Sequence, residues 1–148
     1  MNLNEVEILL VEDNPSEVDL ILHALRSNHV ANSIHVARDG EEALDFLFCR
    51  GVYSHQTFSH PPKIILLDLG IPKMSGLEVL RVIRDDSRTR TVPVVMLTSS
   101  KADQDMMNSY QLGVNSYIQK PIDFNQFRET IRQLDFYWLI LNELAPRA

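Results

Sequence analysis

The stretch that decides the fold is KIILLDLGIPKMSG, residues 63–76. Four apolar residues, 64–67, run without interruption into the carboxylate of Asp68. A short unbroken apolar run is typical of a central strand in a parallel sheet, because both faces of such a strand are covered. A charge inside that strand would need a partner, so we expect Asp68 at its carboxyl end, where open parallel sheets bind ligands. A proline then ends the strand, and Ser75 is the predicted cap of the next helix.

A second stretch near the N-terminus repeats this pattern. Residues 6–11, VEILLV, form another apolar run, and Glu12 and Asp13 follow it directly. Asn14 and Pro15 then suit the cap and the first turn of a helix. The sequence therefore predicts a second buried strand that places carboxylates at its tip.

Five predicted strands alternate with helices along the chain. The predicted strands are residues 6–11, 33–37, 64–68, 93–97 and 116–119. The predicted helices begin near residues 15 and 76 or cover residues 41–48, 102–112 and 124–142. This alternation predicts an α/β fold with a five-stranded, doubly wound parallel sheet, right-handed crossovers and the flavodoxin-like strand order 2-1-3-4-5.

Length and composition agree with one globular domain over residues 1–148. The 148 residues are 45% hydrophobic and 23% charged, which suffices for a full core. The formal net charge of -6 argues against non-specific binding to nucleic acid or to an anionic membrane. The N-terminus lacks the features of a signal peptide, and no apolar run has membrane-spanning length. With Cys49 as the single cysteine, no internal disulfide forms, and we expect a cytoplasmic protein.

The predicted strand order brings chemically useful side chains to one edge of the sheet. Strands one and three are neighbours, so Glu12, Asp13 and Asp68 converge, and strands four and five add Thr98 and Lys120. Carboxylates at close range repel one another unless a cation lies between them, and Mg²⁺ suits oxygen ligands. A carboxylate is also a nucleophile toward phosphorus, and a lysine and a hydroxyl can bind phosphoryl oxygens. Each residue alone is common on a protein surface, but their convergence favours a functional site.

Four short motifs carry a resemblance to a known family. They are VEDN at 11–14, LDL at 67–69 with Pro72 and Gly76, LTS at 97–99, and YIQKP at 117–121. From about residue 5 to residue 134, the chain resembles the receiver domain of two-component response regulators. The resemblance implies a phosphorelay signalling protein, not an enzyme acting on other substrates. It also implies that Asp68 accepts a phosphoryl group from a sensor histidine kinase.

The resemblance assigns roles at the acidic edge. It implies that Asp13 ligates Mg²⁺ directly, that Glu12 acts through water, and that Asp68 and the backbone carbonyl of Gly70 complete the protein ligands. Glu12 replaces the commoner aspartate, and Gly70 lacks the side chain that many relatives carry. Gly70 and Ser100 flank the path of the attacking water in the family, so they leave the lifetime of the phosphoryl group open.

The resemblance also implies a switch. Thr98 and Tyr117 match the switch pair, and Lys120 matches the phosphate-binding lysine. The peptide bond between Lys120 and Pro121 is expected to be cis, as in the family. Phosphorylation is expected to draw Thr98 inward and let Tyr117 turn, which alters the neighbouring protein-interaction surface.

The last predicted helix extends beyond the domain and is apolar on more than one side. Nothing resembling an output module follows it, so we expect a stand-alone receiver that contacts an unknown downstream protein. The apolar residues that lie off its main stripe are Phe136, Tyr137, Leu139, Ile140 and Leu144. They favour a homodimer interface in the extension 135–148, and the alternative is that this segment folds back over its own domain.

Finer and rival interpretations rest on a few residues. The loop 51–62 and FYWL at 136–139 resemble the small response regulators of cyanobacterial phytochromes, which implies a phytochrome kinase as the partner.

The main enzymatic alternative is a phosphohydrolase with an aspartate nucleophile. Such an enzyme usually needs a second acid as general acid at the position of Gly70, and glycine cannot serve in that role. A vestigial receiver that acts only as an interaction module is a further alternative. A flavin carrier would need a phosphate-binding loop after the first strand, where this sequence has acids instead.

Overall fold

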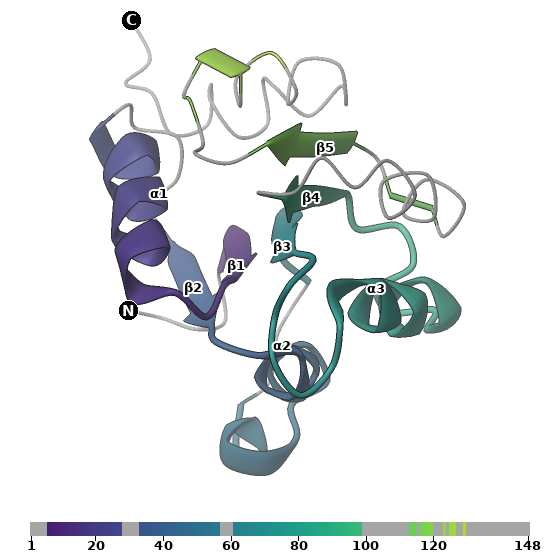
Figure 1. Cartoon of the computed structure of the whole chain (residues 1–148). Helices are drawn as coiled ribbons and strands as arrows, with labels where there is room; N and C mark the ends of the chain where they lie inside the picture. Colours follow the sequence, from purple (N-terminus) through teal and green to yellow (C-terminus); the bar gives the residue numbers. More distant parts are fainter. Residues whose placement is uncertain are drawn as a thin grey trace, which may run out of the picture.

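The computed structural model describes residues 6–27, 33–56, 61–98, 113–114 and 116–119, and positions 123, 125, 126 and 129 (Figure 1). Its elements, in order, are β1 (Ile8–Val11), α1 (Pro15–Ser27), β2 (Ile34–Ala37), α2 (Gly40–Leu47), η2 (Gly51–Tyr53), β3 (Ile64–Asp68), α3 (Gly76–Asp85), β4 (Val94–Thr98) and β5 (Ser116–Gln119). The predicted helix 102–112 and most of the predicted helix 124–142 lie outside the described residues.

The sheet is parallel, and its strand order is β2-β1-β3-β4-β5, which confirms the predicted topology. Val11 at the end of β1 pairs with Leu67 of β3. Glu12 and Asp68 follow these two paired residues, so they leave neighbouring strands at the same level. Asp68 itself pairs with Leu97 of β4. The register therefore brings the polar ends of three adjacent strands to one edge.

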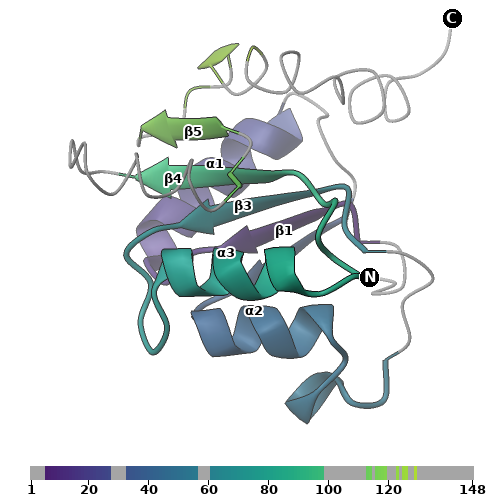
Figure 2. The ribbon, with the colours of Figure 1, turned by 90° about the vertical axis from the view of Figure 1, so that its right-hand side faces the viewer.

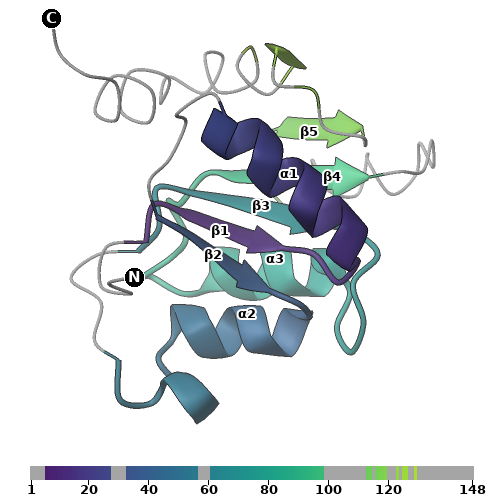
Figure 3. The same ribbon diagram turned by 90° about the vertical axis from the view of Figure 1, so that its left-hand side faces the viewer.

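Side chains alternate between the two faces of the sheet, and a different set of helices covers each face. Figure 3 shows α1 in front of the sheet, and Figure 2 shows α2 and α3 on the opposite side. The core under α1 includes Ile8, Leu10, Val18, Ile21, Leu25, Ile64, Leu66, Val95 and Leu97. The core under α2 and α3 includes Leu9, Val11, Ala43, Phe46, Ile65, Leu67, Val79, Leu80, Ile83, Val94 and Met96. Burial on both faces explains why the strands read as unbroken apolar runs.

In the part of the chain that the structure describes, the helices α1, α2 and α3 each follow a residue whose side chain accepts hydrogen bonds from N–H groups of the first helical turn, which have no partner within the helix. Asn14 Oδ1 accepts from the N–H of Ser16 at 2.9 Å and from that of Glu17 at 3.3 Å. Ser75 Oγ accepts from Glu78 at 3.2 Å, so the predicted caps at Asn14 and Ser75 are confirmed. Asp39 caps α2, which starts one residue earlier than predicted.

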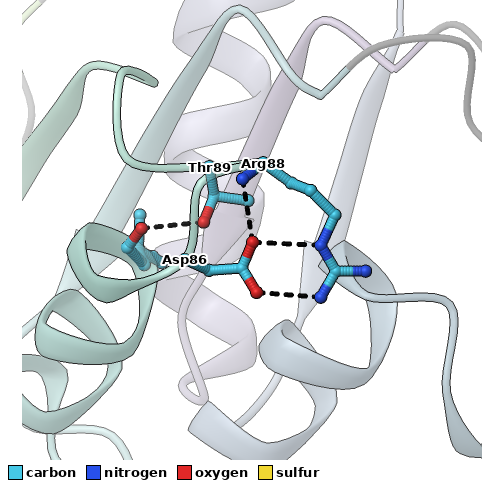
Figure 4. A network of polar contacts seen from close by, with 4 residues as sticks. Asp86, Arg88 and Thr89 are labelled. Atoms are coloured by element: carbon cyan, nitrogen blue, oxygen red, sulfur yellow. Dashed lines mark hydrogen bonds and ion pairs between the residues drawn. The ribbon is translucent and has the colours of Figure 1, made fainter.

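The turn after α3 is closed by its own polar contacts (Figure 4). Asp86 Oδ1 accepts from Arg88 Nε at 3.0 Å, Asp86 Oδ2 accepts from Arg88 Nη2 at 2.8 Å, and Thr89 Oγ1 donates to the carbonyl of Ile83 at 2.7 Å. The hydrogen bonds from Arg88 lower the pKa of Asp86 to about 2. The Arg88 guanidinium also lies 4.6 Å from the centre of the Phe48 ring, which links this turn to the end of α2.

Candidate phosphoacceptor site

Asp68 ends β3, and the chain around it leaves little freedom. Its Oδ1 accepts a hydrogen bond from the backbone N–H of Gly70 at 3.2 Å, and only 6% of the residue is exposed. The N–H of Gly76 then donates to the carbonyl of Leu69 at 3.1 Å. A Cβ atom on Gly76 would lie 2.6 Å from the carbonyl oxygen of Asp68, so only glycine lets α3 begin this close to the strand end. The hydrogen bond from Gly70 orients the Asp68 carboxylate, and the tight turn brings the start of α3 close to the end of β3.

Glu12 is fully buried although it is an acid. Its Oε2 accepts from the backbone N–H of Asp13 at 3.1 Å and from that of Asn14 at 3.3 Å. A buried carboxylate requires such partners, because burial without them disfavours the charged form. The loop that leads into α1 therefore fixes this carboxylate beside the end of β3.

A third acid joins Glu12 and Asp68, and sequence reasoning missed it. Glu17, in the first turn of α1, is half-buried, and each of the three residues offers a carboxylate oxygen within 4.8 Å of the other two. Strand alternation turns Glu12 and Asp68 toward the face that α1 covers, which explains why the start of α1 meets them. In the sequence, Glu17 reads as an ordinary acid at a helix N-terminus, so only the packing of α1 marks it.

The other predicted metal ligands lie nearby but outside this group. Asp13 is exposed, because adjacent residues in extended chain point in opposite directions and its neighbour Glu12 is turned inward. Gly70 is also exposed, and a Cβ atom there would meet nothing within 4 Å. The roles of Asp13 and of the Gly70 carbonyl as ligands stay predictions.

The predicted switch residues sit on the two strands beyond β3. Thr98 ends β4 and is 3% exposed, while Tyr117 on β5 is 39% exposed. Tyr117 pairs with Met96, two residues before Thr98, so alternation places Thr98 and Tyr117 on the same side of the sheet. Lys120 and Pro121 lie outside the described residues, as do Phe136, Tyr137, Leu139, Ile140 and Leu144.

The site thus has one acid held at the edge of a parallel sheet, further acids beside it and a buried threonine on the next strand. This geometry agrees with the result of family comparison. The model of the response regulator receiver domain matches residues 8–132. The chain belongs to the response regulator receiver domain family. Among the described residues of this receiver domain, no helix has the length and apolar character needed to cross a bilayer.

Similar solved structures include response regulators of phytochromes. The bacteriophytochrome response regulator RtBRR is 44% identical with a TM-score of 0.83, and the match covers 96% of this chain and 86% of that one. AtBRR, another bacteriophytochrome response regulator, is 49% identical with a TM-score of 0.82 over 93% of this chain and 99% of that one. Response regulator Rcp1 of Synechocystis sp. is 35% identical over 132 residues, 89% of this chain and 88% of its own. Its Mn²⁺-bound form is 32% identical with a TM-score of 0.74, over 97% of this chain and 100% of that one.

The residues present fit the divalent cation that receiver domains bind. Mg²⁺ and Mn²⁺ prefer oxygen ligands, and Glu12, Glu17 and Asp68 offer carboxylate oxygens within reach of one another. Glu12 and Asp68 are largely removed from water, so their charges are only weakly screened. The arrangement therefore suits a hard divalent ion next to the Asp68 carboxylate.

Proposed function

We propose that this receiver domain accepts a phosphoryl group on Asp68 from a sensor histidine kinase. The observation that carries the proposal is the Asp68 carboxylate, held at the sheet edge by the Gly70 N–H and accompanied by two more carboxylates within 4.8 Å. A carboxylate oxygen of Asp68 attacks the phosphorus of a phosphohistidine. The phosphorus–nitrogen bond breaks, the imidazole leaves with the bonding electrons and takes up a proton, and Asp68 becomes an acyl phosphate.

The residues around Asp68 position the reacting groups. The Gly70 N–H orients the attacking carboxylate, and the backbone N–H groups of Asp13 and Asn14 fix Glu12. A bound Mg²⁺ would neutralise charge on the phosphoryl oxygens, which is the main requirement in phosphoryl transfer. Lys120 is proposed, from its sequence motif, to neutralise these oxygens as well.

Thr98 and Tyr117 are proposed to convert the new charge into a change of surface. The acyl phosphate adds acceptor oxygens near the end of β4, and the buried Thr98 hydroxyl is drawn to donate to one of them. Tyr117, partly exposed on the same side of the sheet, turns toward the space that Thr98 leaves. An unknown downstream protein then reads the altered face.

The proposed upstream partner is a phytochrome histidine kinase. Its support is the similarity to the phytochrome response regulators described above and the sequence of the loop 51–62. A second copy of this chain is a further proposed partner, and its support is the apolar extension 135–148 alone.

The direct test is phosphorylation by a small donor. Wild-type protein is incubated with Mg²⁺ and acetyl phosphate, and intact mass is measured before and after. We expect the wild type to gain the mass of one phosphoryl group and Asp68→Asn to gain none. Asp85→Asn, which changes an exposed acid on α3, serves as the matched control and retains uptake.

Three results would overturn the proposal. An Asp68→Asn variant that is still labelled would place the phosphoacceptor elsewhere. A folded wild type that is never labelled would favour the interaction module. Steady release of phosphate from a generic phosphomonoester would favour the hydrolase.

A further inference from the structure

The helices α1, α2 and α3 offer an internal comparison that singles out one residue. Each helix has a glutamate at its third position, and the N–H of that glutamate donates to the cap, as the bonds to Asn14, Asp39 and Ser75 show. An acid at this position also interacts favourably with the helix dipole. The three glutamates, Glu17 in α1, Glu42 in α2 and Glu78 in α3, therefore share one ordinary structural role.

Their carboxylates lie in different surroundings. Glu78 is exposed. Glu42 Oε2 accepts from the backbone N–H of Arg38, and its Oε1 accepts from the Tyr53 hydroxyl at 3.4 Å. Glu17 is half-buried and approaches Glu12 and Asp68 to within 4.8 Å. The dipole accounts for all three glutamates, but it does not account for a carboxylate placed against two buried acids.

We propose that Glu17 is a further residue of the divalent-cation site and raises the affinity of the unphosphorylated domain for Mg²⁺ and Mn²⁺. This inference rests on the proposed function, because it assigns Glu17 to the ion that assists Asp68. Adding a third negative charge beside Glu12 and Asp68 is unfavourable without a cation and favourable with one. A carboxylate from α1 also ties cation binding to the position of this helix.

The alternative explanation is that Glu17 serves only to start α1. In that case, Glu17→Gln and Glu78→Gln would have equal effects on cation binding, because both remove one charge from the same helical position. Glu78→Gln is therefore the matched control. Glu17→Asp, which keeps the charge on a shorter side chain, is a second variant. It distinguishes an effect of the negative charge on cation binding from an effect of side-chain packing.

The experiment measures ion binding and not phosphorylation. Mn²⁺ is titrated into the full unphosphorylated chain, free Mn²⁺ is followed by electron paramagnetic resonance, and Mg²⁺ is measured by competition. We expect Glu17→Gln to weaken Mn²⁺ binding roughly tenfold, Glu17→Asp to weaken it less, and Glu78→Gln to match the wild type. In thermal unfolding, saturating Mg²⁺ should raise the midpoint of Glu78→Gln more than that of Glu17→Gln, because tighter binding stabilises the folded state more.

The outcomes separate this inference from the proposed function. If Glu17→Gln binds Mn²⁺ as tightly as Glu78→Gln does, while Asp68→Asn binds it weakly, the role of Glu17 is overturned and the site at Asp68 stands. If Glu17→Gln weakens binding but acetyl phosphate never labels Asp68, the cation site stands and the phosphoacceptor role falls. A wild type that binds no Mn²⁺ overturns both.

Discussion

Glu17 in the first turn of α1 and Asp68 at the end of β3 present carboxylate oxygens within 4.8 Å of each other. Their proximity follows from the register of the sheet and from the place of α1 upon it. The pairing of Val11 with Leu67 sets the ends of β1 and β3 at one level, and a loop of residues 12–14 joins β1 to α1. The face that receives the Asp68 side chain is the face that α1 covers.

The close approach of Gly76 to the Asp68 backbone predicts that a single added methyl group at Gly76 destabilises the fold. In Gly76→Ala, the new Cβ would lie 2.6 Å from the Asp68 carbonyl oxygen and 2.9 Å from Leu69 Cα, and both are backbone atoms that cannot move alone. We expect the free energy of unfolding to fall by about 1–3 kcal/mol, as measured by urea denaturation.

The matched control for this substitution is Gly70, the glycine two residues after Asp68. In Gly70→Ala, the added Cβ would meet nothing within 4 Å, and we expect a change within about 0.5 kcal/mol. Equal stabilities of the two variants would show that α3 does not need glycine to approach the end of β3.

His35 on β2 predicts a pH dependence of stability. Its ring stacks on Phe46 with centroids 4.1 Å apart, and its Nε2 lies 2.9 Å from the Tyr53 hydroxyl. Burial lowers the pKa of His35 below 6.5, and the nearby Glu42 opposes this shift only in part. The unfolded chain therefore binds more protons at His35, so the contribution of His35 to the free energy of unfolding is present above pH 6.5 and is lost as the pH falls below it.

The measurement is urea denaturation at several pH values on both sides of 6.5. His35→Gln should flatten the decrease at low pH, because it removes the group whose pKa differs between the two states. His55→Gln changes an exposed histidine and should keep the wild-type slope. A slope that His35→Gln leaves unchanged would assign the pH dependence to other groups.

The proposed role of Tyr117 predicts that its removal leaves phosphorylation intact and abolishes the structural rearrangement that follows it. In Tyr117→Ala, the acidic group at Glu12 and Asp68 keeps its residues, so acetyl phosphate should label the variant as it labels the wild type. The rearrangement on the Thr98 side of the sheet should be lost, because no ring remains to turn inward. Hydrogen exchange of β4 and β5, with and without phosphorylation, measures this, and Tyr117→Phe is the control that keeps the ring. Loss of labelling in Tyr117→Ala would contradict the assigned role.

The apolar residues of the extension 135–148 predict that the chain forms a homodimer. A chain truncated after Leu134 lacks the apolar residues proposed to contact a second copy and should sediment as a monomer. In the full-length chain, replacing Phe136 and Leu139 by serine should weaken the dimer while leaving labelling by acetyl phosphate intact. A truncated chain that still sediments as a dimer would place the interface elsewhere.

The sequence by itself determined the architecture and the centre of the site. The unbroken apolar runs before Glu12 and Asp68 marked strands buried on both faces, and their alternation with amphipathic helices determined the parallel order of the sheet. Because parallel strands end at one edge, the strand order predicted that Glu12 and Asp68 lie at the same edge of the sheet.

The tertiary structure decided which acids face one another. Strand geometry turns Glu12 inward and leaves its neighbour Asp13 exposed, a choice that two adjacent acids in a sequence do not reveal. Glu17 joins Asp68 only because α1 packs on the face of the sheet toward which Asp68 projects, which brings carboxylate oxygens of the two residues within 4.8 Å of each other. Helix periodicity shows which face of α1 is apolar, but the contact between its N-terminus and another strand depends on packing between elements that are distant in sequence.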